Sequence, residues 1–114
     1  MLETEVLKIE GDIHVVALKG RLTLGSRLSL LEAEVNTLAD KGARKVILDL
    51  ENVEYADSAA LGVLLHASGA VRAKGGKLLL AAPNERLQHL FKLTNTAPLL
   101  TSYPSRAVCI SHLL

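Results

Sequence analysis

The chain alternates short apolar runs with longer amphipathic stretches, which predicts alternating strands and helices. Residues 4–9 and 13–18 are strand-like and are joined by residues 10–12, whose Gly and Asp favour a tight turn, so a hairpin is expected. The second run is apolar on nearly both faces, which suits a strand inside a sheet. The first run carries Glu5 and Lys8, which suit an edge strand.

The rest of the chain continues this alternation, with helices expected to end near Gly42, at Gly75-Gly76 and at Asn95. Expected helices span residues 26–41, 58–74 and 84–94, with a terminal helix capped by Ser105. Expected strands span residues 46–50, 77–81 and 99–103, and residues 51–56 are expected to form a polar loop. The residues expected to face inward are Leu28, Leu31, Val35, Leu38, Leu61, Leu64, Leu65, Val71, Leu87, Leu90, Phe91, Val108, Cys109 and Ile110.

This order of elements predicts an α/β fold. Strands joined by helices form a mostly parallel sheet through right-handed crossovers, and the hairpin adds an antiparallel strand at its start. A length of 114 residues suits one ordinary domain, and no linker or internal repeat divides the chain. We therefore expect one domain over residues 1–114, with a mixed sheet and about four α-helices.

Composition excludes several classes of protein. A hydrophobic content of 49% against 22% charged residues excludes a disordered chain, and no apolar run approaches the ~20 residues of a membrane span. Thirteen basic residues nearly balance twelve acidic ones, and the three aromatic residues offer little surface for stacking on bases, so direct nucleic-acid binding is not expected. The lone Cys109 and an N-terminus without signal-peptide character indicate a cytoplasmic protein.

Ser58 is the main candidate for a functional residue. It opens an expected helix just beyond the carboxyl end of a strand, where ligands often meet open α/β sheets and where the helix dipole favours an anion. In one interpretation Ser58 caps the helix and contributes ~1 kcal/mol, a role that Asp57 can equally fill. In the other it is phosphorylated, which would add a charge of about −1.5 to −2. Position alone favours the cap.

Several charged and polar residues are expected around Ser58. Asp49 and Asp57 are the carboxylates expected nearest to it, although Asp49 is better explained as a half-buried group bonded to backbone N–H groups. The segment after the second strand should end near the same edge of the sheet. The residues of this segment expected to border the Ser58 surface are Arg21, Thr23, Ser26 and Arg27.

No catalytic or metal site emerges from the sequence. The nearest histidine, His66, lies about 12 Å along the helix from Ser58, too far to act as its base, and a Gly-x-Ser-x-Gly elbow is absent. The four histidines fall on separate elements without ligand spacing. Residues 74–77 contain two glycines but follow a helix and precede a strand, the reverse of a phosphate-binding loop. We expect no enzyme activity, cofactor or metal.

The motifs together resemble the STAS domain, and within it the bacterial anti-sigma factor antagonists. The resemblance rests on residues 46–50, on Asp-Ser-Ala-Ala-Leu-Gly at 57–62 and on residues 74–78 and 90–94, and it includes residues 20–22. The family hallmark is Asp-Ser-Ser-Gly-Leu-Gly after an apolar strand that ends in Asp. This chain departs from the family pattern at Ala59, at Ala60 and at Thr23, where many antagonists have Asp.

The resemblance implies a switch protein. In that family the unmodified antagonist binds an anti-sigma factor that is also a serine kinase of the histidine-kinase-like ATPase type, and so frees a sigma factor for transcription. Phosphorylation of the first motif serine, here Ser58, breaks the complex, and a PP2C-type phosphatase restores it. The partner-binding residues implied for this chain are Arg21, Thr23, Asp57, Ser58, Ala59, Ala60 and Leu61.

Two other functions stay open. STAS domains also serve transport systems, such as lipid ABC transporters and anion transporters, as docking or regulatory subunits. A scaffold subunit of a stress-signalling complex is the third possibility. In the transport role Ser58 would be only a helix cap.

Overall fold

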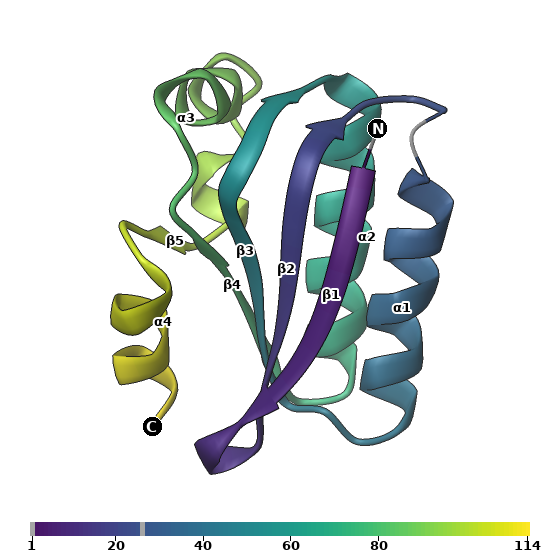
Figure 1. The fold of residues 1–114 in the computed structure, drawn as a ribbon, viewed down its shortest axis with the longest axis vertical. Helices are drawn as coiled ribbons and strands as arrows, with labels where there is room; N and C mark the ends of the chain where they lie inside the picture. The colour runs from purple at the N-terminus through teal and green to yellow at the C-terminus, as the bar shows by residue number, and fades with distance from the viewer. Residues whose placement is uncertain (1, 26) are drawn as a thin grey trace.

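Five strands form one mixed sheet in the order β1-β2-β3-β4-β5. They are seen in a computed structural model that describes residues 2–25 and 27–114 (Figure 1). The strands are β1 (Leu2–Ile9), β2 (Ile13–Leu22), β3 (Lys45–Ala56), β4 (Lys77–Ala81) and β5 (Ser102–Tyr103). The α-helices of the described chain are α1 (Leu28–Asp40), α2 (Ser58–Ala73), α3 (Glu85–Leu93) and α4 (Arg106–Leu113). This arrangement confirms the predicted α/β class.

The hairpin and its place in the sheet are confirmed. β1 and β2 pair antiparallel, with Ile9 opposite Ile13, while β2, β3, β4 and β5 are parallel neighbours. The mostly exposed β1 lies at the edge and the apolar β2 lies between two strands, as their sequences predicted. The carboxyl ends of the parallel strands therefore face one end of the molecule.

Helices cover both faces of the sheet (Figure 1). α1 and α2 lie side by side on one face, over the larger part of the core, which includes Val16 and Leu48. α4 covers part of the other face, over a smaller cluster that includes Val15 and Ile47. Successive residues of a strand point to opposite faces, so both faces of β2 and β3 are buried and apolar. The residues that were expected to be inward but are only partly buried are Leu38, Leu65, Leu90, Val108 and Ile110.

The predicted polar loop at residues 51–56 is wrong, because β3 continues through it to Ala56. β2 also extends to Leu22 and provides a partner for these residues, with register shifts along the way. Val53 and Ala56 are buried in the core while their polar neighbours are exposed. The longer strand carries the chain farther beyond β4 before α2 begins.

Two other boundaries differ from the prediction. β5 is only two residues long, because residues 97–99, with Pro98, form a 3-10 turn. α1 begins at Leu28, whereas Ser26, the expected start, lies outside the described residues. Asn95 has a left-handed backbone with φ of 56° after α3, as expected for a helix end.

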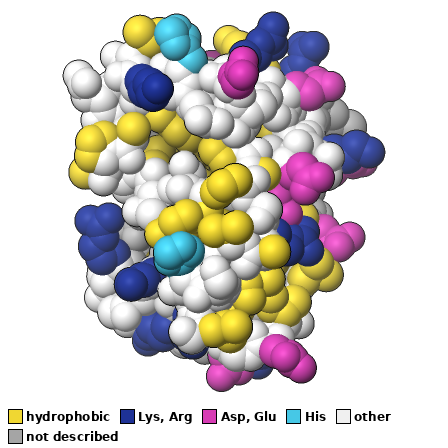
Figure 2. Space-filling view, turned by 90° about the vertical axis from the view of Figure 1, so that its left-hand side faces the viewer, with side chains coloured by type: hydrophobic (Ala, Val, Ile, Leu, Met, Phe, Trp, Pro, Cys, Tyr) yellow, Lys and Arg dark blue, Asp and Glu magenta, His cyan; other side chains and the backbone are white. Residues whose placement is uncertain are grey.

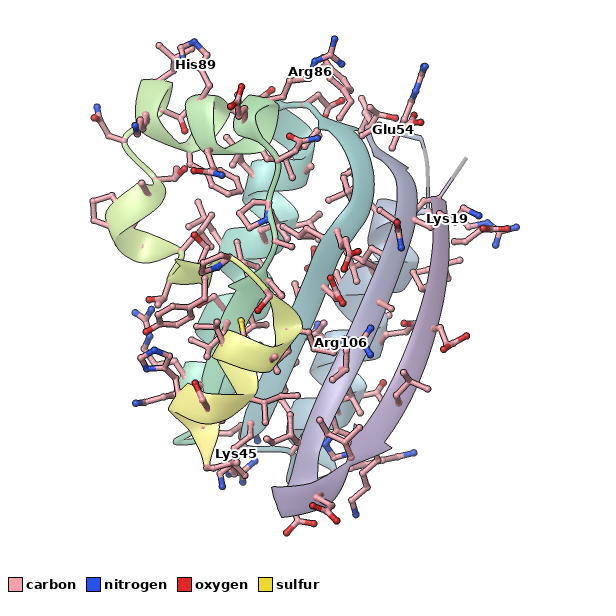
Figure 3. All side chains as sticks on the ribbon, turned by 60° about the vertical axis from the view of Figure 1, so that its left-hand side comes forward. Lys19, Lys45, Glu54, Arg86, His89 and Arg106 are labelled. Atoms are coloured by element: carbon pink, nitrogen blue, oxygen red, sulfur yellow. The ribbon has the colours of Figure 1, made fainter. Side chains whose placement is uncertain are left out.

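Asp49 lies on the face of the sheet opposite α2, so its predicted proximity to Ser58 is wrong. Its carboxylate is buried and accepts a hydrogen bond from the Glu51 N–H (3.0 Å), which confirms the expected bonding to a backbone N–H group. The other carboxylate oxygen accepts a 2.8 Å hydrogen bond from Arg106 Nε, at the start of α4 (Figure 3). The pair ties α4 to β3.

Cys109 should be unreactive in the folded protein. Burial and the negative charge of Asp49 raise the pKa of its thiol from 9.0 to about 11. An alkylating reagent at about pH 8 should modify this thiol only after unfolding, since the thiolate is the nucleophile. The unfolded thiol ionises at lower pH than the folded one, so the free energy of unfolding should fall as the pH rises from 9.0 to about 11. Equal alkylation rates for native and denatured protein would contradict this prediction.

Candidate functional site

The site lies where β3 ends and α2 begins, beside the end of β2. Leu22 and Ala56 are register partners at the last pair of the two strands. The N–H of Asp57 then donates to the carbonyl oxygen of Leu22 (3.0 Å), and α2 starts at Ser58. The helix N-terminus is thereby fixed at the carboxyl end of the parallel sheet.

Asp57 is the N-cap of α2. Its Oδ1 accepts a hydrogen bond from the Ala60 N–H (3.1 Å), and its Oδ2 accepts one from the Leu24 N–H (2.9 Å). One carboxylate therefore caps the helix and also holds the loop that follows β2. The cap interpretation of Ser58 is wrong, because Asp57 fills that position. Ser58 is the first helical residue, and its exposed hydroxyl makes no hydrogen bond with any described residue.

The two adjacent residues should differ in their effect on stability. Asp57→Ala removes both hydrogen bonds and should lower the free energy of unfolding by about 1–2 kcal/mol. Ser58→Ala removes no hydrogen bond and should change it by less than about 0.5 kcal/mol. Chemical denaturation of the two variants measures both values. A larger loss from Ser58→Ala than from Asp57→Ala would show that the cap is assigned to the wrong residue.

The expected partner-binding residues differ in exposure. Ala60 and Leu61 point into the core, so a partner could meet them only through their backbone. Ala59 is half-buried at the surface of α2, and Thr23 is half-buried in the loop beside Leu24. Arg21 is exposed and forms an ion pair with Glu54 (3.8 Å). The residues of this set with side chains at the surface are Arg21, Thr23, Asp57, Ser58 and Ala59.

Two apolar side chains near Ser58 were missed by the sequence analysis. Leu24 is 80% exposed although its backbone is held by Asp57, and Tyr55 at the end of β3 is 43% exposed. The backbone of Leu24 is bonded to the Asp57 side chain, and Tyr55 lies at the end of the strand that leads to Asp57, so both exposed side chains belong to this part of the surface. Tyr55 lies two residues before Asp57 in the sequence, whereas only the fold brings Leu24 to this place, and the exposure of both side chains depends on the tertiary structure.

A catalytic or metal site around the Ser58 hydroxyl would need a base in contact with it or a cluster of metal-binding side chains. His66 lies near Glu32, with 3.8 Å between its Nδ1 and the carboxylate, and no base contacts the Ser58 hydroxyl among the described residues. The part of the chain that the structure describes also holds no group of three or more side chains suited to a metal ion. Nor does any helix described here have the length and apolar character needed to cross a membrane.

Comparisons with known proteins point to one family. The STAS domain family matches residues 5–108. A Thermotoga neapolitana protein, named as a candidate anti-sigma factor antagonist and TM1081 homolog, is 36% identical over 96 residues, covering 84% of this chain and 85% of that protein. The structure of TM1081 from Thermotoga maritima, also a candidate antagonist, matches with a TM-score of 0.88 at 23% identity, covering 96% of this chain and 93% of that one.

A third similar protein has been solved in two chemical states. The anti-sigma factor antagonist SpoIIAA in its unphosphorylated form has a TM-score of 0.82 at 19% identity, covering 97% of this chain and 96% of SpoIIAA. The phosphorylated form of SpoIIAA, described as a Bacillus cell fate determinant, has a TM-score of 0.76 at 18% identity, covering 98% and 100%. At these identities the match extends to the fold.

Proposed function

This chain belongs to the STAS domain family, and we propose that it is an anti-sigma factor antagonist whose partner binding is switched off by phosphorylation of Ser58. The observation that carries the proposal is the exposed hydroxyl of Ser58 at the start of α2, which Asp57 frees from capping. The relative at 36% identity, itself named as a candidate antagonist, supports the same role.

The proposed partner surface surrounds Ser58. It consists of the start of α2, the loop after β2 and Tyr55 at the end of β3. The hydrogen bond from the Leu24 N–H to Asp57 holds this loop beside α2. Leu24 and Tyr55 supply apolar area, while the Arg21–Glu54 pair supplies polar groups at its margin. An apolar centre with a polar rim is typical of protein interfaces.

Phosphorylation would act on this surface rather than on the fold. The N-terminus of α2 favours negative charge, so the helix can keep its structure with a phosphate on Ser58. At the centre of an interface the same charges would have to lose water or face repulsion, which costs several kcal/mol when they are unpaired. Ala60 does not obstruct an approaching kinase, because its methyl group is buried in the core.

The proposed partners are an anti-sigma factor that is also a serine kinase, and a PP2C-type phosphatase that restores the unmodified state. The chain itself then needs no catalytic group and acts as a regulatory protein, not as an enzyme. The isolated Cys109 supports a cytoplasmic site of action.

Recovery of the tagged chain from its native cells tests the proposed function. An anti-sigma factor with an ATPase domain should copurify with the chain and should be lost with Leu24→Glu. Leu93→Glu is the matched control, because Leu93 is also an exposed leucine, 68% against 80% for Leu24, and lies on α3. Transporter subunits or a large stress-signalling assembly in place of the anti-sigma factor would contradict the proposal.

A further inference from the structure

The amino-terminal part of β4, before Leu80, lies at an open edge of the sheet. β5 pairs only with Leu80 and Ala81, through bonds in which the Leu80 N–H donates to Thr101 (2.9 Å) and the Ala82 N–H to Tyr103 (2.9 Å). On the opposite side, the Lys77 N–H donates toward β3, to the carbonyl oxygen of Arg44 (2.8 Å). Backbone groups alternate in direction along a strand, so the N–H and C=O of Leu78 face the β5 side.

A groove follows this edge between α2 and α4. Its volume is about 390 Å³, and Leu78 and Leu79 of β4 line it together with residues of both helices and of the chain before β5. The polar residues that line it are Ser68, Arg72, Lys77, Thr101, Tyr103 and His112. The groove thus brings the backbone N–H and C=O of Leu78, which β5 does not pair with, close to several polar side chains.

The groove is cationic. Arg72 and Lys77 make no ion pair with any residue the structure describes, whereas Lys74 pairs with Asp40 (3.7 Å). No Asp or Glu is among the lining residues, and His112 stacks on Tyr103 with 4.0 Å between ring centroids. On this face of the molecule, Lys and Arg side chains gather at the lower left while most acidic ones lie to the right (Figure 2).

Lys45 lies on the strand beside Lys77, although its side chain lines a neighbouring pocket and not the groove itself. It is the register partner of Lys77 and lies at the lower end of the molecule (Figure 3). A groove lined by Arg72 and Lys77 and by no acidic side chain attracts a negatively charged ligand.

We propose that an extended acidic segment of a partner protein docks in this groove as a short added strand on the edge of β4. The segment would form backbone hydrogen bonds with the N–H and C=O of Leu78, as in strand addition to a sheet edge. Its carboxylates would lie near Arg72 and Lys77. A second copy of this chain fits poorly, because pairing two β4 edges would bring the same cations together.

This surface is separate from the one around Ser58. Arg72 follows Ser58 by fourteen residues on α2, which is roughly 21 Å along the helix. Lys77 lies at the amino end of β4, whereas Ser58 lies beyond the carboxyl end of β3. The two surfaces can therefore be occupied together, and failure of one proposal leaves the other standing.

A synthetic six-residue peptide with Glu at its four central positions, which places carboxylates on both faces of the added strand, tests the proposal by NMR titration of the intact chain. The amides of residues 76–80 should shift, and hydrogen exchange of the Leu78 amide should slow. The double variant Arg72→Glu, Lys77→Glu should weaken binding at least tenfold. The double variant Lys8→Glu, Lys41→Glu is the control for net charge, because both lysines are exposed and line a different pocket. It should weaken binding less than threefold.

A peptide methylated on every backbone nitrogen separates strand addition from simple attraction of charge. It keeps the carboxylates but loses the N–H groups of a ladder, so its binding should fall at least tenfold. Equal binding of the methylated peptide, or equal shifts with inorganic phosphate, would show a site for anions only and overturn the proposal. Shifts confined to residues around Ser58 would overturn it as well.

Discussion

Ser58→Asp should weaken binding to the anti-sigma factor by at least ~30-fold relative to Ser58→Ala, which corresponds to about 2 kcal/mol. The aspartate places a charge at the centre of the proposed interface, where it must lose water without gaining a partner. The fold should tolerate it, since an acidic residue in the first turn favours the helix dipole. Isothermal titration calorimetry measures both affinities, and a thermal melt should show that the two variants are equally folded.

Asn36→Asp is the matched control for this experiment. Asn36 is exposed on α1, and its replacement adds one negative charge without changing the shape of the side chain. It should leave the affinity within about threefold of the unmodified chain. If Ser58→Asp and Ser58→Ala bind equally well, the phosphorylation switch is wrong.

Gly76→Ala should lower the free energy of unfolding by about 3 kcal/mol. A Cβ atom at this position would lie 2.6 Å from the carbonyl oxygen of Arg44 and 2.8 Å from its Cα. Both are backbone atoms of the residue just before β3, so relief requires the amino ends of β3 and β4 to move apart. Chemical denaturation measures the loss.

Gly75→Ala separates this contact from the ordinary cost of replacing a glycine. Gly75 has a φ of +84°, but a Cβ there would meet nothing within 4 Å. Its replacement should cost about 1–2 kcal/mol, from the left-handed backbone alone. A larger loss at Gly75 than at Gly76 would show that backbone conformation, and not the approach to Arg44, controls this turn.

The regular elements could be predicted because apolar spacing and turn residues agreed along most of the chain. The hairpin, the buried strands and the three long helices all carried both signals. The extension of β3 was missed because residues 51–56 are mostly polar. They form a strand because β2 also extends and pairs with them, which is a tertiary contact without a local signal.

The start of α2 was predicted, but not which residue caps it. The sequence marked Asp57 and Ser58 as a helix start, but both residue types are good caps, and only the structure shows which side chain reaches the Ala60 N–H. Side chains along β3 alternate between the two faces of the sheet, and this alternation could have shown that Asp49 faces away from α2. Leu48 and Leu50 contact the core under α1 and α2, which leaves Asp49 for the α4 side.

The groove beside β4 could not have been predicted, because it arises where β5 stops. The sequence suggested a strand over residues 99–103, which would have covered the edge at Leu78. The turn at residues 97–99 shortens β5 and leaves that edge open.

Mass spectrometry of the peptide that contains Ser58, from chain recovered from its native cells, tests the phosphorylation switch most directly. The bound and free fractions are separated first, by capture of the anti-sigma factor. We expect phosphate on Ser58 in the free fraction and an unmodified peptide in the bound fraction. Phosphorylated Ser58 in the complex, or no phosphate on Ser58 in either fraction, would contradict it.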